Sequence, residues 1–331
     1  MESTKETDKS VLARELELEG LHQFSLREFL SETFKSYSWS DIENRLVIGS
    51  ESTTPHLSLG MAQFPKPWLF VRIFSATLLA YFIFLLVLNI YQQVAMIAIP
   101  ALIFTGCFAV PFAVLTLFYE INTPRNISIF QVIKLLVIGG AFSFLFSFIL
   151  FDAFPLYKVY GASAAGLIEE LAKIFAVVFM GRLFIKGRHP YILNGLLYGA
   201  AVGTGFAAFE SAGYALAAGL EYNSFLALNL SIWLRGFLAP FMHITWTAIA
   251  GAAFWMSFKE CQSFWNAFIK ARFLALFVIS IALHFLWNID LDDLGIISNI
   301  RFIVIGVISW VICFMLAATG FKEIRHECEK I

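Results

Sequence analysis

Eight stretches of about 18 or more mainly apolar residues alternate with short polar connections along the chain. A helix needs about 20 such residues to cross the hydrocarbon core of a bilayer, because each residue adds 1.5 Å. The stretches are residues 73–90, 96–118, 135–151, 162–184, 193–218, 238–258, 273–289 and 302–319. They predict an all-α fold, a polytopic membrane helix bundle of about eight transmembrane helices.

Charged residues are scarce and unevenly placed. They make up 14% of the chain, against roughly 25% in soluble domains. The formal net charge of −1 implies no nucleic-acid partner. Lysine and arginine gather before the first stretch and after the second, fourth, sixth and eighth. The positive-inside rule then predicts a multi-pass protein of the cell (plasma or inner) membrane with both termini in the cytoplasm.

Three parts are expected along the chain. Residues 1–67 are polar and should form a cytoplasmic N-terminal segment, with a disordered start and a short amphipathic helix. Ser25 and Glu28 have the spacing of a capping box, which predicts that this helix runs through Leu26, Leu30 and Phe34. Residues 68–321 form the membrane domain, and 322–331 a cytoplasmic tail.

The four cysteines lack metal-site spacing, and their predicted locations make disulfides improbable.

The fourth stretch contains three ionisable residues in five positions: Glu169, Glu170 and Lys173. Each charge within a membrane span costs roughly 2.5 to 3.5 kcal/mol, so these residues predict intramembrane chemistry or transport. The spacing also permits a purely structural Glu169–Lys173 ion pair, which would leave Glu170 unpaired. Two carboxylates held close cannot both ionise easily. One of them is therefore expected to be available as an acid or a base.

Three further stretches carry polar or aromatic residues on one helical face. They are Phe209, Glu210 and Tyr214 in the fifth, His243, Trp246 and Thr247 in the sixth, and His284, Trp287 and Asn288 in the seventh. The helical rise places the glutamates and histidines at one level, roughly 7 to 15 Å from the outer surface. Because isolated charges in lipid are costly, the sequence predicts one water-accessible cavity in the outer half of the bilayer.

Structural interpretations of these residues remain open. Glu210 and Tyr214 could form a supporting hydrogen-bond pair, and His243 an interhelical hydrogen bond. The tryptophans could belong to the interface belt of aromatic residues. His284 and Asn288, one turn apart, offer two donors for an oxyanion.

Four ordered motifs resemble the PrsW family of intramembrane proteases, which is related to the CaaX prenyl endopeptidases and the bacteriocin-protection-type membrane proteases. The motifs are EELAK at 169–173, FESAGY at 209–214, His243, and HFLWN at 284–288, within a region of about 118–288. The resemblance implies regulated proteolysis near the extracytoplasmic face, with a single-pass membrane protein such as an anti-sigma-factor-like regulator as substrate. The chain departs from the CaaX branch at Lys173, Glu210 and Tyr214, so prenyl-protein processing is not expected.

The resemblance and the residue types together predict peptide hydrolysis by a glutamate-activated water. Glu169 would act as general base and then as acid, while Glu170, restrained by Lys173, would tune it. His284 and Asn288 would stabilise the oxyanion, and His243 would position the water. The supporting residues would be Lys173, Phe209, Glu210, Tyr214 and Trp287. The sequence leaves open which glutamate is the base.

Three alternatives to this mechanism or function stay open. A zinc ion held by His243, His284 and a glutamate is the lesser cofactor hypothesis, because the chain has no HExxH pair and Lys173 would repel a dication. No cofactor is therefore expected. A proton- or ion-coupled transporter would use the same residue types, although no internal repeat is visible. A non-catalytic membrane scaffold could retain the same polar cavity.

Overall fold

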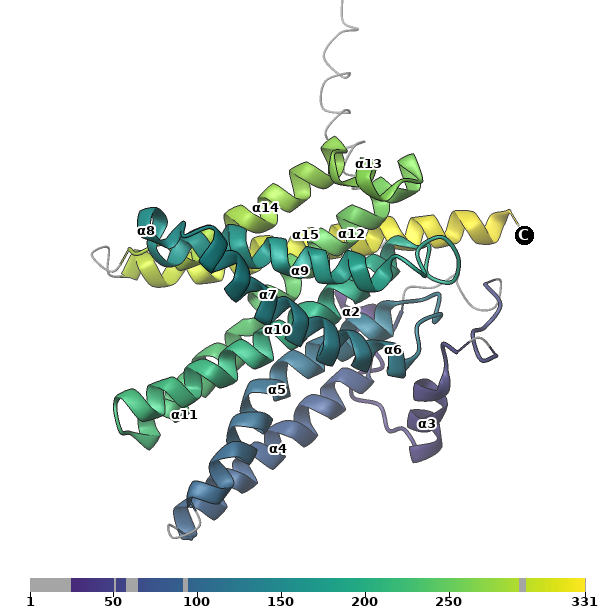
Figure 1. Cartoon of the computed structure of the whole chain (residues 1–331). Helices are drawn as coiled ribbons and strands as arrows, with labels where there is room; N and C mark the ends of the chain where they lie inside the picture. The colour runs from purple at the N-terminus through teal and green to yellow at the C-terminus, as the bar shows by residue number, and fades with distance from the viewer. Residues whose placement is uncertain (1–24, 51, 58–64, 92–94, 292–295, 331) are drawn as a thin grey trace, which may run out of the picture.

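The computed structural model describes residues 25–50, 52–57, 65–91, 95–291 and 296–330, and within them every regular element is helical (Figure 1). The membrane-domain helices are α4 (Leu69–Ile90), α5 (Ala95–Ile121), α6 (Ile129–Lys134), η3 (Leu135–Gly139), α7 (Gly140–Ala153), α8 (Tyr157–Tyr160), η4 (Gly161–Ala164), α9 (Ala165–Gly181), α10 (Ile192–Glu221), α11 (Phe225–Leu238), η5 (Ala239–Phe241), α12 (His243–Cys261), α13 (Phe264–Phe268), α14 (Ala271–Asn288) and α15 (Ile296–Glu329). The predicted all-α membrane bundle is confirmed.

Seven described helical segments are long and apolar enough to cross a membrane, where the sequence predicted about eight. The difference arises in the stretch 162–184, because its regular helix α9 has only 17 residues and is preceded by the 3-10 turn η4. The sixth stretch also differs. A separate helix, α11, precedes it, and Pro240 lies in the turn η5 before α12 begins at His243. Proline cannot donate a backbone hydrogen bond, which favours a break there.

Helix α10 lies at the centre of the bundle. An apolar segment of 18 residues in this helix is 94% buried. Glycines let it pack closely against α12. A Cβ atom on Gly199 would lie 2.1 Å from the carbonyl oxygen of Thr247, and one on Gly251 would lie 2.4 Å from that of Gly195. Small residues at helix interfaces permit such close approach in membranes.

A second glycine contact joins α10 to the helix formed by η3 and α7. A Cβ atom on Gly205 would lie 1.9 Å from the carbonyl oxygen of Leu136, and one on Gly140 would lie 2.6 Å from the Cα atom of Gly205. Directly beyond this crossing the rings of Phe144 and Phe206 meet edge to face, with centroids 5.6 Å apart. The helix formed by η3 and α7 is therefore in close contact with α10 at the level of these glycines.

The N-terminal segment differs from the prediction. Helix α2 (Leu26–Phe29) has only four residues, so the predicted continuation through Leu30 and Phe34 is wrong, and Phe34 is 89% exposed. The side chain of Ser25 does accept from the Glu28 N–H, as an N-cap does. A second short helix, α3 (Trp39–Val47), follows. The predicted disordered start lies outside the described residues.

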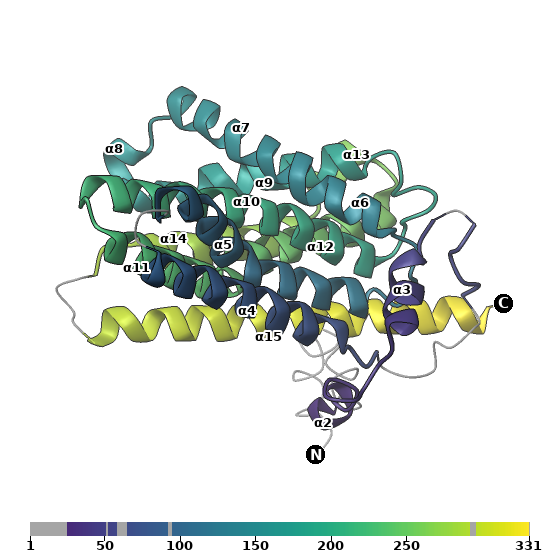
Figure 2. The ribbon, with the colours of Figure 1, turned by 90° about the horizontal axis from the view of Figure 1, so that it is seen from below.

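A buried polar cluster fixes the loop between α9 and α10. The His189 ring donates from Nε2 to the Asn126 carbonyl, 2.9 Å away, and its Nδ1 accepts from the Tyr198 hydroxyl at 2.7 Å. Trp255 donates its indole N–H to the His189 carbonyl. Burial lowers the pKa of His189 to about 4, so the ring is neutral at pH 7. Helices α3 and α13 and the C-terminus lie toward this end of the bundle, and α8 lies toward the other (Figures 1 and 2).

Candidate active site

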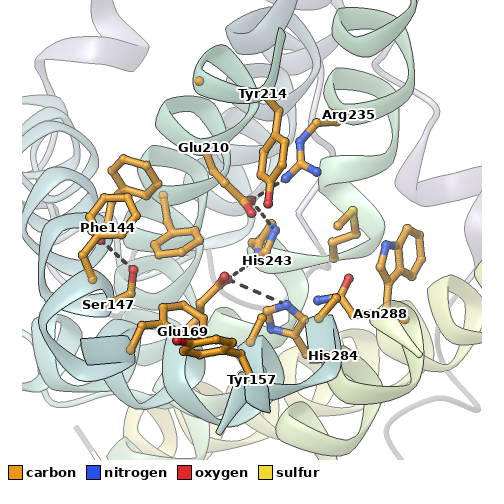
Figure 3. Close-up of a pocket in the computed structure, with 18 of the residues that line it drawn as sticks. Phe144, Ser147, Tyr157, Glu169, Glu210, Tyr214, Arg235, His243, His284 and Asn288 are labelled. Carbon is orange, nitrogen blue, oxygen red and sulfur yellow. Dashed lines mark hydrogen bonds and ion pairs between the residues drawn. The ribbon is translucent and has the colours of Figure 1, made fainter. Parts of the chain in front are cut away.

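The bundle contains a cavity of about 720 Å³ at the end where α8 lies, since Tyr157 of α8 is one of its lining residues. Its ionisable and amide lining side chains come from α9, α10, α11, α12 and α14 and, tyrosines apart, are Glu169, Glu210, Arg235, His243, His284 and Asn288 (Figure 3). Aromatic and small residues from α7, α8 and α10 make up much of the remaining wall. Polar groups from separate stretches therefore meet at one cavity, as the predicted depths required.

The two adjacent glutamates have different surroundings. Glu169 lines the cavity, and its Oε2 atom is buried without a hydrogen-bond partner among the described residues. The Glu170 side chain is fully buried behind it and accepts from Lys173 Nζ at 2.5 Å. Its Oε1 atom is also 2.9 Å from His284 Nδ1. Glu169 is therefore the carboxylate of the pair that a molecule in the cavity would meet.

Lys173 joins the carboxylates to a histidine. Its side chain is fully buried, and Nζ lies 3.0 Å from His243 Nδ1 but 3.9 Å from Glu169 Oε2. The ammonium also lies over the Phe206 ring, 4.5 Å from the centroid. The permitted Glu169–Lys173 ion pair is thus present at 3.9 Å, but the expectation that it leaves Glu170 unpaired is wrong, because Glu170 is the closer partner of Lys173.

The two histidines flank Glu169 (Figure 3). Its Oε2 atom is 3.8 Å from His243 Nδ1 and 3.7 Å from His284 Nε2. Because an ammonium group only donates, His243 Nδ1 accepts from Lys173, and its proton is then on Nε2, 2.9 Å from Glu210 Oε2. His284 donates from Nδ1 to Glu170, which leaves its Nε2 as an acceptor facing Glu169.

Arg235 was not among the residues predicted for the site. Its guanidinium lies 2.7 Å from Glu210 Oε2 and over the Tyr214 ring, 4.0 Å from the centroid. The sequence predicts the sixth stretch only from residue 238, so it leaves Arg235 in a connection between stretches and does not predict α11. The available signal was its position as an isolated arginine eight residues before His243 in an otherwise apolar region.

The remaining predicted residues divide by location. Asn288 and Trp287 line the cavity, and Tyr214 lies at its rim, 54% exposed. Phe209 does not line it and packs instead against Phe108 of α5, with ring centroids 6.4 Å apart. Trp287 and Trp246 are buried against each other, with centroids 6.0 Å apart, which excludes the interface-belt interpretation for this pair.

Three of the residues could hold a metal ion. Glu169, His243 and His284 each offer a donor atom, and these atoms lie within 4.8 Å of one another. Two imidazoles and a carboxylate are a known ligand set for catalytic zinc. Glu210 contacts the Nε2 atom of His243, and Glu170 contacts the Nδ1 atom of His284. Metal-bound histidines usually have a carboxylate or carbonyl partner of this kind at the ring nitrogen that does not bind the metal.

A family model described as PrsW family intramembrane metalloprotease matches residues 66–318. The chain belongs to the PrsW family. Its membership makes it an intramembrane peptide hydrolase, and the transporter and scaffold alternatives are set aside. The comparisons with curated proteins and with solved structures gave no match. Because the PrsW family is described as metalloproteases and the donor trio is present, a metal is possible, and the expectation of no cofactor stays a prediction.

Replacing Arg235 by glutamine should lower kcat/KM for a membrane substrate about tenfold or more, equivalent to about 1.4 kcal/mol. The reason is that Arg235 balances Glu210, which in turn contacts His243. The double variant Arg235→Gln, Glu210→Gln should be no worse than Glu210→Gln alone, because the two residues act through one contact.

Arg272→Gln is the matched control, since Arg272 forms an ion pair with Glu260 and does not line the cavity. Strictly additive losses in the double variant would show that Arg235 acts independently of Glu210.

Proposed function

We propose that this chain hydrolyses a peptide bond of a single-pass membrane protein inside the cavity, with Glu169 as the general base. The observation that carries the proposal is the position of Glu169. Glu169 lines the cavity and its partner-free oxygen lies between two imidazoles, whereas Glu170 does not line the cavity and is bonded to Lys173. A carboxylate that accepts a proton from water needs such a free oxygen within reach of the substrate.

The hydrolysis proceeds in two steps. Glu169 removes a proton from a water molecule as the water oxygen attacks the scissile carbonyl carbon, which gives a tetrahedral intermediate with a negative oxygen. The C–N bond then breaks, and Glu169 returns the proton to the leaving amine. The products are a new carboxyl group and a new amine, and Glu169 is regenerated.

The histidines orient the water in this mechanism. His284 Nε2 and Glu169 Oε2, 3.7 Å apart, are both acceptors, so one water can donate a hydrogen to each. The oxyanion role predicted for His284 would require a second proton on its ring. We assign that role to the Asn288 amide, which lines the cavity one turn beyond His284.

A bound divalent metal is the second candidate, favoured by the Glu169, His243 and His284 trio and by the description of the family. The donor types fit, and Glu169 and His284 each have a free donor atom. A zinc ion held there would supply Lewis acidity for the hydrolysis. His243 fits less well, because its Nδ1 is 3.0 Å from Lys173 Nζ. That ammonium already supplies a positive charge at the position next to Glu169, so we favour the mechanism without a metal.

We further propose that the cavity opens on the extracytoplasmic side of the cell membrane. Support comes from the basic residues near α13 and in the C-terminal part of α15, at the end of the bundle away from α8. Cytoplasmic ends of membrane proteins are enriched in lysine and arginine. An anti-sigma-factor-like regulator cut near its outer end would be one substrate of this kind.

Glu169→Gln should abolish cleavage and leave a folded protein, because it removes a proton acceptor without leaving a cation unpaired. Glu170→Gln, in contrast, should lower the free energy of unfolding by about 3 to 5 kcal/mol. The reason is that Lys173 loses the carboxylate that lies 2.5 Å from its Nζ atom. Products from a panel of single-pass proteins in proteoliposomes would be identified by mass, and thermal unfolding followed in detergent.

The control for these two variants is Glu221→Gln, at the exposed end of α10. Wild-type turnover by Glu169→Gln would remove Glu169 from the mechanism.

The sidedness is testable with single cysteines in a background that lacks Cys107, Cys261, Cys313 and Cys328. A cysteine at Val159, which is 75% exposed in α8, should react with an impermeant maleimide added outside intact cells. A cysteine at Trp265, which is 82% exposed in α13, should react only after lysis. The opposite pattern would invert the topology.

Metal dependence separates the two candidate mechanisms. Purified enzyme dialysed against strong chelators should keep its cleavage rate, and elemental analysis should find no stoichiometric metal. This outcome is expected because Lys173 provides the positive charge beside Glu169. Loss of activity that zinc or cobalt restores would establish the metal mechanism, with Glu169, His243 and His284 as the ligands.

A further inference from the structure

The cavity lies where α7 and α10 face each other beyond their glycine crossing. Gly140 and Gly205 hold the two helices in backbone contact, and the Phe144–Phe206 ring pair closes the space immediately after it. On α7 the lining residues beyond Phe144 are Ser147, Phe148 and Phe151, and on α10 those beyond Phe206 are Glu210, Gly213, Tyr214 and Ala217. The α7 wall of this part of the cavity is therefore mostly aromatic, and on α10 two of the smallest residues, Gly213 and Ala217, lie one turn apart beside Glu210 and Tyr214.

Gly213 differs from the glycines that pack α10 into the bundle. A Cβ atom on Gly195, Gly199 or Gly205 would come within 3 Å of a neighbouring carbonyl oxygen, so those positions need glycine for packing. A Cβ atom on Gly213 would meet nothing within 4 Å. The space in front of Gly213 is therefore not required by the fold of the described residues, and it belongs to the cavity.

This space lies next to the reacting groups. Gly213 is three residues after Glu210 on the same helical face, and residues at this spacing have Cβ positions about 5 to 6 Å apart. Glu210 contacts His243, which flanks the buried, partner-free Oε2 atom of Glu169. Because Gly213 and Glu169 line the same cavity, the side chain of a substrate residue that flanks a peptide bond held at Glu169 can extend toward Gly213.

We infer that Gly213, with Ala217 and Phe148, forms the subsite for a large apolar side chain flanking the scissile bond, and that Gly213 sets its size. The inference rests on the proposed function. The chemistry of the walls supports it, because Phe148 and Phe151 offer apolar surface and Ala217 adds no polar group. Phe148 is also 54% exposed, so the subsite borders the surface from which a membrane-embedded segment would arrive.

The test is a size exchange between enzyme and substrate. Single-pass substrates would carry Gly, Ala, Leu or Phe at each of the two residues flanking the cut, in proteoliposomes with wild type, Gly213→Ala, Gly213→Val and Gly213→Leu. Wild type should prefer Leu or Phe at one of the two positions. Gly213→Leu should lower kcat/KM for those substrates about 10- to 200-fold, the usual effect of pocket size, and leave Gly or Ala substrates within about threefold of their wild-type values.

Two controls make each outcome decisive. Leu216→Phe alters an exposed residue of the same helix that does not line the cavity, and it should leave the preference unchanged. Gly213→Ala adds one methyl group to open space, so it tests the trend even if larger side chains prevent folding. An equal loss for all substrates, or no change in preference across the folded variants, would overturn the subsite while leaving the protease function standing. Failure of wild type to cut any substrate would overturn the proposed function and the subsite with it.

Discussion

The compensation of two buried carboxylates and one largely buried carboxylate by two cations governs how the bundle is arranged around its cavity. Glu169, Glu170 and Glu210 lie among apolar helices, where an unpaired charge is very costly. Lys173 and Arg235 offset much of that cost, and the histidines fill the gaps between the ions. The contacts that these groups make with His243, His284 and Arg235 cross from one helix to another, so the requirement for charge compensation also fixes α9, α10, α11, α12 and α14 relative to one another.

Close backbone packing makes this network possible. Because α10 meets α12 and α7 through glycines, its glutamate can reach His243 on α12. At Gly213 the absence of a side chain has the opposite result, because no neighbouring atom fills the space in front of it. Glycine therefore permits close helix packing in one part of α10 and leaves open space in the cavity in another. The difference depends on whether a neighbouring helix contacts the glycine.

Much of the fold and part of the site could be predicted from the sequence. Apolar length and helical spacing were sufficient for the membrane bundle and for the convergence of Glu169, Glu210, His243 and His284. The pairing of the charges was not predictable, because Lys173 lies at a permissible spacing from both adjacent glutamates and side-chain packing makes the choice. The role of Arg235 was hidden for another reason: an apolar region of continuous helical character does not reveal where η5 breaks it.

The ion pair between Lys173 and Glu170 also bears on how the protein enters the membrane during synthesis. Its two residues are three positions apart on one helix, so α9 can bring this charge and its counter-charge into lipid together, before α12 and α14 have left the ribosome. Glu169 has no comparably close partner on its own helix and gains its flanking imidazoles only when His243 and His284 arrive. The order of the chain therefore means that the group formed by Glu169, His243 and His284 can be complete only after α14 has been made, when most helices of the bundle already exist.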